Sequence, residues 1–383
     1  MDSVKKLKTE SGLSLYHPWV SFIYFAAVIA GTLLFIHPVF VGVSLLCAIF
    51  ASVMINGRKT VFATLGFGIP MFIFIALANQ VIEEGGVVCG AKFDKDFHLI
   101  HDFAQTKEEL KPLMGSKYLQ SDIKDCYKKV KNYLLQERLV LFVGTPCQVM
   151  GLKLYLRKEY NNLLAIEVVC HGVPSPLVWE KYLDEVCKRK KISLNEIENI
   201  SFRNKDKSWR VFNLKIEGKD KTILKESLHD NLYMRGFLQN LFLRQSCHNC
   251  PAKNFNSMAD ISLADYWGID RFHPEIDDNK GVSAMILYNK KIKLDFNKLL
   301  LDFKKLKLDF KNTTLRNILE TNTALVKSAK PHPRREEFFE TMQEKGLLNL
   351  KQYVGEPTLK KIKRKTRWFL SDVKALIMKK GGF

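Results

Sequence analysis

The chain has 383 residues and a formal net charge of +20, from 60 Lys and Arg against 40 Asp and Glu. It is long enough for two domains, and its eight cysteines are spread through a long basic sequence, which excludes a small secreted disulfide scaffold. The charge indicates an anionic partner: a phosphate-bearing cofactor, a nucleic acid or a lipid surface. No nucleic-acid-binding motif accompanies the charge, so nucleic acid is not predicted as a partner.

The first 80 residues are predicted to form a transmembrane segment. No Lys, Arg, Asp or Glu occurs between Ser11 and Gly57, and Pro18–Ile36 and Pro38–Asn56 each approach the ~20 residues that span a bilayer. Basic residues before and after this hairpin place both of its ends on the cytoplasmic side. A third uncharged run, Thr60–Ile82, is expected to be a helix that leads toward the soluble domain.

Four short motifs occur in this part of the chain, in the order His17-Pro18, His37-Pro38-Val39-Phe40, Asn56-Gly57-Arg58-Lys59 and Ala76-Leu77-Ala78-Asn79. With them, residues 11–79 resemble the start of the transmembrane T component of energy-coupling factor transporters. The resemblance covers only the first few helices of that family and not its cytoplasmic coupling helices. It therefore does not imply a working transporter.

The stretch Leu139–Pro176 predicts a strand, a helix and a second strand. Leu139–Val143 and Leu164–Val169 are short apolar runs that end at glycine or proline breakers, and Gln148–Tyr160 has apolar residues near helical spacing. A strand–helix–strand unit of this kind makes its two strands parallel. We therefore expect an α/β soluble domain with a parallel or mixed sheet in which these two strands are adjacent.

Four cysteines are predicted to meet at one edge of this sheet. Cys147 and Cys170 follow the carboxyl ends of the two strands, where α/β sheets bind ligands, and Cys247 and Cys250 form a C-x-x-C pair. Four thiolates can hold a tetrahedral metal or a 4Fe-4S cluster, and spacing alone does not separate zinc from iron–sulfur. The alternative, that Cys147 and Cys170 are small buried apolar residues, ranks lower.

Two further strands with an alternating pattern, Ser201–Lys205 and Trp209–Ile216, are expected to form a hairpin, and Asp260–Trp267 is expected to be another strand. Cys126 and Cys187 fall in predicted helices, each without a second cysteine nearby. The cysteines expected to take no part in metal binding are therefore Cys47, Cys89, Cys126 and Cys187.

The motifs of the soluble part occur in a fixed order: Gly85-Gly86-Val87-Val88, Gly115–Ser121, Gly144–Gln148, Cys170–Pro176, Ser201–Lys205, the Cys247/Cys250 pair and Asp265–Gly268. As an ordered set they resemble the beta-subunit family of coenzyme F-420 hydrogenases and dehydrogenases. The resemblance implies a 4Fe-4S cluster on Cys147, Cys170, Cys247 and Cys250, and FAD as a second cofactor. It also implies electron transfer to or from coenzyme F-420 or another redox carrier, whether a small molecule or a partner protein.

The residues predicted to bind the cofactor are Gly115, Lys117, Ser121, Thr145, His171, Arg203 and Lys205. The three basic residues would neutralise phosphate groups, and His171 would donate to a cluster sulfur or to a flavin. From the sequence alone, an ordinary solvated loop is the better account of Gly115–Ser121, and a capped loop histidine is the plainer account of His171. The family's cysteine-rich start is replaced here by the membrane-like segment, so one electron relay is missing.

The expected organisation is a transmembrane segment (1–80), an F-420 hydrogenase/dehydrogenase beta-subunit-like α/β domain (81–330) and a basic helical tail (331–383). The tail would lie on an anionic membrane lipid surface or pack on its own domain. The expected function is an iron–sulfur, flavin-containing oxidoreductase or electron carrier at the cytoplasmic membrane face. The alternatives are a membrane-anchored, inactive binding or scaffold protein, linked to polysaccharide modification, and a truncated or chimeric reading frame. No catalytic residue is predicted.

Overall fold

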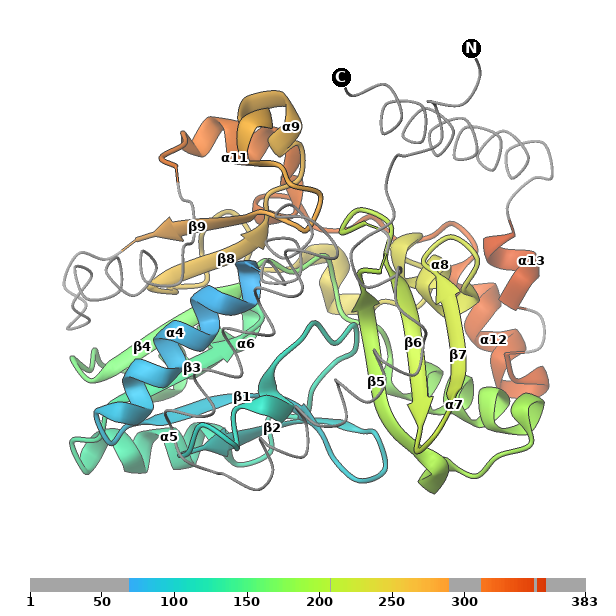
Figure 1. The fold of residues 1–383 in the computed structure, drawn as a ribbon, viewed down its shortest axis with the longest axis horizontal. Coiled ribbons are helices and arrows are strands. Elements are labelled where there is room, and N and C mark those ends of the chain that lie inside the picture. Colours follow the sequence, from blue (N-terminus) through green and yellow to red (C-terminus); the bar gives the residue numbers. More distant parts are fainter. Residues whose placement is uncertain (1–68, 207, 289–310, 348–349, 356–383) are drawn as a thin grey trace, which may run out of the picture. The chain divides into compact units, whose positions relative to one another are not determined.

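The computed structural model describes residues 69–206, 208–288, 311–347 and 350–355, all within one compact unit that begins at Ile69 (Figure 1). The predicted spans Pro18–Ile36 and Pro38–Asn56 lie outside the described residues, as does most of the basic tail. Among the helices described, none combines the length and the apolar character that crossing a membrane requires.

A six-stranded mixed sheet forms the centre of this unit, with the strand order β2-β1-β3-β4-β8-β9. The four inner strands are parallel to one another, and the two edge strands are antiparallel to their neighbours. The bounds are Leu99–Ala104 for β2, Val87–Phe93 for β1, Val140–Gly144 for β3, Leu163–Val168 for β4, Ile261–Asp265 for β8 and Ser283–Leu287 for β9. The sheet confirms the expected mixed α/β class.

The strand–helix–strand prediction is confirmed, because β3 and β4 pair in parallel from Val140 opposite Leu163 to Gly144 opposite Glu167. The helix between them, α6 (Pro146–Leu156), begins two residues earlier and ends four residues earlier than predicted. Its start is fixed by a proline in the first turn and by a capping box between Thr145 and Gln148. It stops at Arg157, which adopts a left-handed conformation.

Helices cover both faces of the large sheet. On one face, α4 (Ile69–Glu83) buries Leu77, Ala78 and Val81 against a core that includes Leu141 and Leu164. On the other face, α5 (Cys126–Leu135) and α6 pack over Phe142 and Ala165. The third apolar run is therefore helical from Ile69 onward, as expected, and its last turns pack on the soluble domain.

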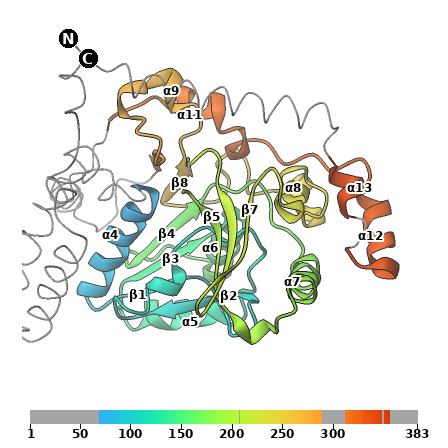
Figure 2. The same cartoon turned by 45° about the vertical axis from the view of Figure 1, so that its right-hand side comes forward.

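A three-stranded antiparallel sheet, in the order β5-β6-β7, joins several helices around a second core. Its aromatic centre contains Trp179, Phe202, Tyr233, Phe242 and Phe338. The elements are β5 (Ile197–Asn204), β6 (Asn213–Gly218), β7 (Thr222–Ser227), α7 (Pro176–Lys190), α8 (Leu232–Leu238), α12 (Arg335–Lys345) and α13 (Leu350–Val354), with α12 and α13 drawn in red in Figure 2. Part of the sequence expected to be a tail thus belongs to this core.

The remaining elements are short helical segments: α9 (Ile269–Phe272), α11 (Leu315–Thr321), and the 3-10 turns Lys111–Leu113, Leu194–Glu196, Gln245–Asn249, Pro274–Ile276 and Thr323–Leu325. The predicted hairpin exists as β5 and β6, but β6 begins at Asn213 and not at Trp209. Trp209 is fully buried instead and stacks on Trp267, with ring centroids 4.9 Å apart. The strand therefore begins four residues later than the alternating pattern predicted, and Trp209 belongs to the aromatic packing before it.

Candidate functional site

The parallel strands end on the same edge of the large sheet, and polar and thiol side chains lie in the segments that follow them. The Asp94–His98 turn follows β1, Thr145 to Cys147 follow β3, and Cys170 to Ser175 follow β4. In open α/β sheets the carboxyl ends of the strands form the usual ligand-binding edge. This edge is therefore the place to look for a site.

A cavity of about 720 Å³ lies at this edge and includes Cys147 in its wall. The wall is formed by the turn after β1, by residues 119–124 and by the starts of α6 and α7. Two of the predicted cofactor-binding residues, Ser121 and Thr145, line it, and so does Arg244, which the sequence had not singled out. The volume falls within the range of about 300–1,000 Å³ that is usual for small-molecule sites.

A hydrogen-bond network fixes the wall beside Cys147. The Gln148 side-chain oxygen accepts from the backbone N–H of Thr145 at 2.9 Å, and its amide nitrogen donates to Ser121 Oγ at 2.8 Å. Tyr127 donates its hydroxyl to the backbone oxygen of Gln148 at 2.8 Å. The Thr145 hydroxyl lies 3.3 Å from the Cys147 sulfur. The network holds the start of α6, and therefore Cys147, in one position.

The four predicted metal-binding cysteines are close enough for their charges to act on one another. Burial raises the pKa of the half-buried Cys170 to about 12; the charge of Lys253 lowers it, and the charges of Cys147 and Cys247 raise it further. Burial likewise raises the pKa of Cys247, and the charges of Cys147 and Cys250 add to this effect. Cys147 is exposed, and the other three are half-buried. The thiols therefore gather around one region.

The chemistry of these donors fits an iron–sulfur cluster. Backbone N–H groups already point at two of the sulfurs, since Val173 donates to Cys247 at 3.5 Å and Gly172 donates to Cys170. Hydrogen bonds of this kind stabilise sulfur-bound negative charge and tune iron–sulfur sites. In the described part of the chain, no three cysteine sulfurs lie within 4.8 Å of one another.

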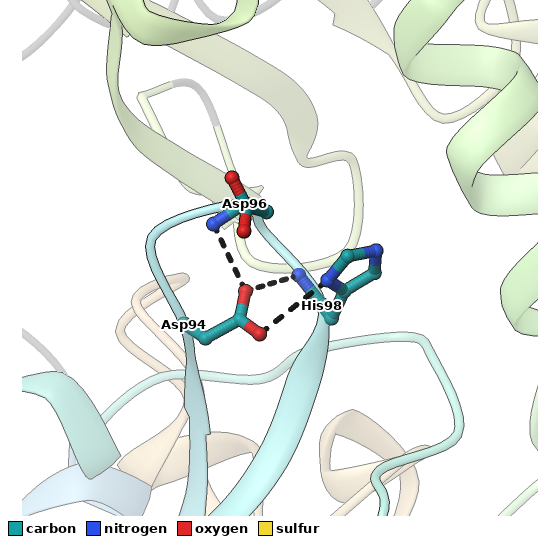
Figure 3. Close-up of side chains that lie close together, drawn as sticks. All are labelled: Asp94, Asp96 and His98. Carbon is teal, nitrogen blue, oxygen red and sulfur yellow. Dashed lines mark hydrogen bonds and ion pairs between the residues drawn. The ribbon is translucent and has the colours of Figure 1, made fainter.

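The described residues contain one group of three closely spaced ligand atoms, formed by Asp94, Asp96 and His98, all within 4.8 Å of one another (Figure 3). One oxygen of Asp94 accepts from the backbone N–H groups of Asp96 and His98, at 3.0 and 2.9 Å. The other oxygen lies 3.4 Å from His98 Nδ1. These contacts account for the group as the closure of the β1–β2 turn at the rim of the cavity.

The C-x-x-C loop is held in place by residues Ala324–Lys330, which we call the strap. Cys250 donates its backbone N–H to Ser328 Oγ at 3.0 Å, and His248 Nδ1 donates to the backbone oxygen of Ala329 at 2.8 Å. Lys253, buried below the loop, donates to the backbone oxygens of both Cys170 and Ala324. The strap and Lys253 therefore connect the cysteine loop to the end of β4.

Each of the predicted phosphate-binding side chains has a partner within the protein. Lys117 donates to the backbone oxygens of Leu113, Met114 and Gly115, and its burial lowers its pKa to about 8. Arg203 forms an ion pair with Asp265, and Lys205 donates to the backbone oxygen of Lys280 at 3.3 Å. None of the three lines the cavity beside Cys147.

His171 and Gly115 are also placed away from the cavity wall. His171 Nε2 lies 2.6 Å from Asn240 Oδ1, and the ring meets Phe237 edge-on. Asn240 in turn donates to the backbone oxygen of Lys330 at 2.8 Å, which ties the segment after Cys170 to the strap. Gly115 adopts a φ of +83°, a conformation suited to glycine, in the exposed turn that Lys117 closes.

The expectation that Cys126 has no second cysteine nearby is wrong. Cys89 on β1 hydrogen-bonds to Cys126 at the start of α5; burial raises the pKa of Cys89, and this bond lowers the pKa of Cys126. Both side chains belong to the core between the sheet and α5. The two cysteines are far apart in sequence, so only the pairing of β1 with its covering helix brings them together.

Some residues of the site left a signal in the sequence and others did not. Thr145 and Gln148 stand at the spacing of a capping box, which predicts both the helix start and the bond between them. Arg244, Lys253 and Asn240 act through contacts with distant segments, and no local pattern marks them.

Residues 137–308 match the family model for the C-terminal part of the beta subunit of coenzyme F420 hydrogenase/dehydrogenase. The matched range contains all four predicted metal-binding cysteines. It begins at residue 137, so it gives no support to the resemblance of residues 11–79 to a transporter component.

Among solved structures, the chain is similar to one in the xenon-derivatized F420-reducing NiFe hydrogenase complex from Methanosarcina barkeri. The identity is 14%, the alignment covers 67% of this chain and 83% of that chain, and the TM-score is 0.41. No curated protein matches the chain.

Proposed function

We propose that the protein is an iron–sulfur oxidoreductase or electron-transfer protein of the F-420 hydrogenase/dehydrogenase beta-subunit type. One observation carries this proposal: the charges of Cys147, Cys170, Cys247 and Cys250 act on one another, and Cys147 lies in the wall of a cavity of about 720 Å³ at the carboxyl edge of the parallel strands. The match of residues 137–308 to the corresponding family supports it. Because that family model describes one subunit of an enzyme, the protein would exchange electrons with partner subunits or with small carriers.

Cys147, Cys170, Cys247 and Cys250 would hold a 4Fe-4S cluster, which takes up and releases single electrons. The N–H groups of Gly172 and Val173 would stabilise the charge on the cysteine sulfurs. Lys253 places a positive charge beside Cys170 and orders the backbone on both sides of the site. The network of Thr145, Gln148 and Ser121 would keep Cys147 facing the cavity.

The cavity would take the planar ring of a flavin or of coenzyme F-420. Ser121 and Thr145 lie in its wall as polar groups that fix the orientation of a ring, and Cys147 lies in the same wall. A carrier bound there would therefore stand next to the cluster. Fluorescence titration of the purified chain with FAD and with coenzyme F-420 tests this part, and absence of saturable binding for both would refute it.

Iron analysis of protein purified without oxygen tests the cluster. Wild-type protein should be brown and contain about four iron atoms per chain, whereas Cys147→Ser should lose most of this iron because a ligand is removed. Cys187→Ser is the matched control, since Cys187 lies in α7 and belongs to the second core. Equal iron in the two variants, or a colourless wild-type protein without iron, would contradict the proposal.

We further propose that the site faces the cytoplasm, where iron–sulfur sites are assembled and kept from oxidation. The basic residues on either side of residues 18–56 support this orientation, because they place both ends of the predicted hairpin on the cytoplasmic side. Labelling of a cysteine introduced near His37 from outside the cell, with protection of one introduced at the exposed Gly115, is the expected result. The reverse pattern would refute the proposed orientation.

A further inference from the structure

The two chain segments around the C-x-x-C loop are basic and contain no Asp or Glu of their own; Glu336 and Glu337 follow directly after the second segment. Residues 244–253 carry the loop, and residues 324–335 include the strap and the residues that follow it. The six Lys and Arg in these segments, with no Asp or Glu, are Arg244, Lys253, Lys327, Lys330, Arg334 and Arg335. We call this the basic surface.

Hydrogen bonds join the two segments into one surface. The bonds from Cys250 to Ser328 and from His248 to Ala329 place Lys327 and Lys330 on either side of the point where the strap crosses the loop. Arg335 donates to the backbone oxygen of Leu243 at 3.0 Å, next to Arg244. Positive charges therefore lie in both of the segments that these bonds join at the half-buried Cys247 and Cys250.

Three of these charges are exposed and form no ion pair with another residue that the structure describes. Arg244, Lys327 and Lys330 are exposed, and in the part of the chain that the structure describes none of them forms a salt bridge. Arg334 pairs with Glu337, and Lys253 is buried and bonded to backbone oxygens. Like charges held together without neutralisation repel one another, so an acidic partner would be attracted to this surface.

We propose that the basic surface is the docking site of an acidic electron-transfer protein of the ferredoxin type. This inference rests on the proposed function, because docking here would bring the partner's cluster next to the cluster that the four cysteines would hold. The reduced partner would give up one electron and the bound cluster would accept it, with no transfer of an atom or a proton. Complementary charge raises the association rate of such pairs and makes it depend on salt.

The composition of the surface favours a protein over a membrane. Binding to a lipid surface uses exposed apolar side chains together with basic ones. Large apolar side chains are exposed at several places in the described residues, including Leu154, Leu177 and Leu315, but none belongs to residues 244–253 or 324–335. The basic surface thus offers charge and hydrogen-bond donors without an apolar anchor.

The test uses the full chain and a reduced, acidic bacterial 4Fe-4S ferredoxin as the probe. The variant Lys327→Glu/Lys330→Glu reverses both strap charges. Its matched control, Lys219→Glu/Lys221→Glu, makes the same charge change in the exposed β6–β7 turn, within the other sheet. Stopped-flow spectroscopy gives the rate of electron transfer, and calorimetry with oxidised ferredoxin gives the affinity without any electron transfer.

At low salt, the strap variant should lower both the rate of electron transfer and the affinity for ferredoxin at least about tenfold, and the control should change them less than about twofold. At high salt the two variants should no longer differ in rate or affinity, because salt screens the charges. Equal effects of the two variants, or no salt-dependent binding by the wild-type protein, would overturn the docking proposal. Binding without electron transfer would instead count against the proposed function and leave docking supported.

Vesicles of phosphatidylcholine and phosphatidylglycerol in equal parts test a lipid surface as the alternative partner. If the strap variant loses vesicle binding but binds ferredoxin as the wild type does, the basic surface is a lipid site and the proposal is refuted.

Discussion

His101 is a buried histidine on β2 that the structure keeps neutral. Its Nε2 donates to the backbone oxygen of Val143 at 3.1 Å, and its ring stacks on Phe142, with centroids 5.5 Å apart. The other ring nitrogen, Nδ1, is buried without a partner. Burial lowers the pKa of His101 from 6.5 to about 4, because a charged imidazole would lose its hydration there.

This pKa shift predicts that acid weakens the fold. The unfolded chain binds a proton on His101 below a pKa of 6.5, whereas the folded chain resists it down to about 4, so stability should fall as the pH falls through this window. Between about pH 7.5 and about pH 5 this one group should remove about 2 kcal/mol of the free energy of unfolding.

Urea unfolding at the two pH values measures this change in the free energy of unfolding. His101→Gln, which does not titrate, should lose this part of the pH dependence; the same pH dependence in the variant and in the wild type would exclude His101 as its source.

At the same scale, the sequence predicted some functional side chains and missed others. Cys147 and Cys170 were predicted to share a sheet edge because a strand end and a breaker are local signals. Arg203 and Lys205 were expected to face phosphate because they are basic and close to a motif. The partners that occupy them, Asp265 and the backbone of Lys280, come from segments more than sixty residues away. Such contacts leave no pattern in the local sequence.

Among the elements, the strap is the feature that orders the cysteine loop. Lys253 donates to the backbone oxygens of Cys170 and Ala324, each at 2.5 Å, and it is only 8% exposed. One ammonium group thus satisfies two backbone carbonyls from segments that are distant in sequence. The strap follows α11 and carries no motif that the sequence analysis had singled out. Its role as a cover for the loop depends on tertiary hydrogen bonds and could not be predicted.

Lys253→Met should therefore detach the strap while keeping a similar side-chain length. The two carbonyls would lose their charged donor, and the free energy of unfolding should fall by about 3 kcal/mol. Hydrogen–deuterium exchange should become faster in residues 324–330. The exposed Lys327→Met serves as the control and should change stability by less than about 0.5 kcal/mol. Slow exchange of the strap in the Lys253 variant would show that Lys253 does not hold it.

At the scale of the whole molecule, the described fold begins at Ile69 and contains two cores around two sheets. The fold class and the adjacent strands were predictable, because runs of apolar residues with breakers predict parallel strands and their crossover helix. The end of the domain was not predictable from composition. Residues 335–354 are rich in charge, yet Phe338, Met342 and Leu350 are buried in the second core. With Leu347, Tyr353 and Val354, these side chains commit both helices to that core.

A chain that begins at Ile69 should fold and bind iron as the full chain does, because every hydrogen bond and core contact described at the site lies within residues 69–355. Its α4 is needed, since Leu77, Ala78 and Val81 are fully buried on the sheet that carries Cys147 and Cys170.

In this shortened chain, Leu77→Ala should lower the free energy of unfolding by about 3 kcal/mol through the cavity it leaves. Glu84→Ala, at an exposed position just beyond α4, should change it by less than about 0.5 kcal/mol. Urea unfolding and iron analysis measure both outcomes. A shortened chain that is soluble but unfolded, or folded without iron while the full chain holds it, would show that residues 1–68 contribute directly to the domain.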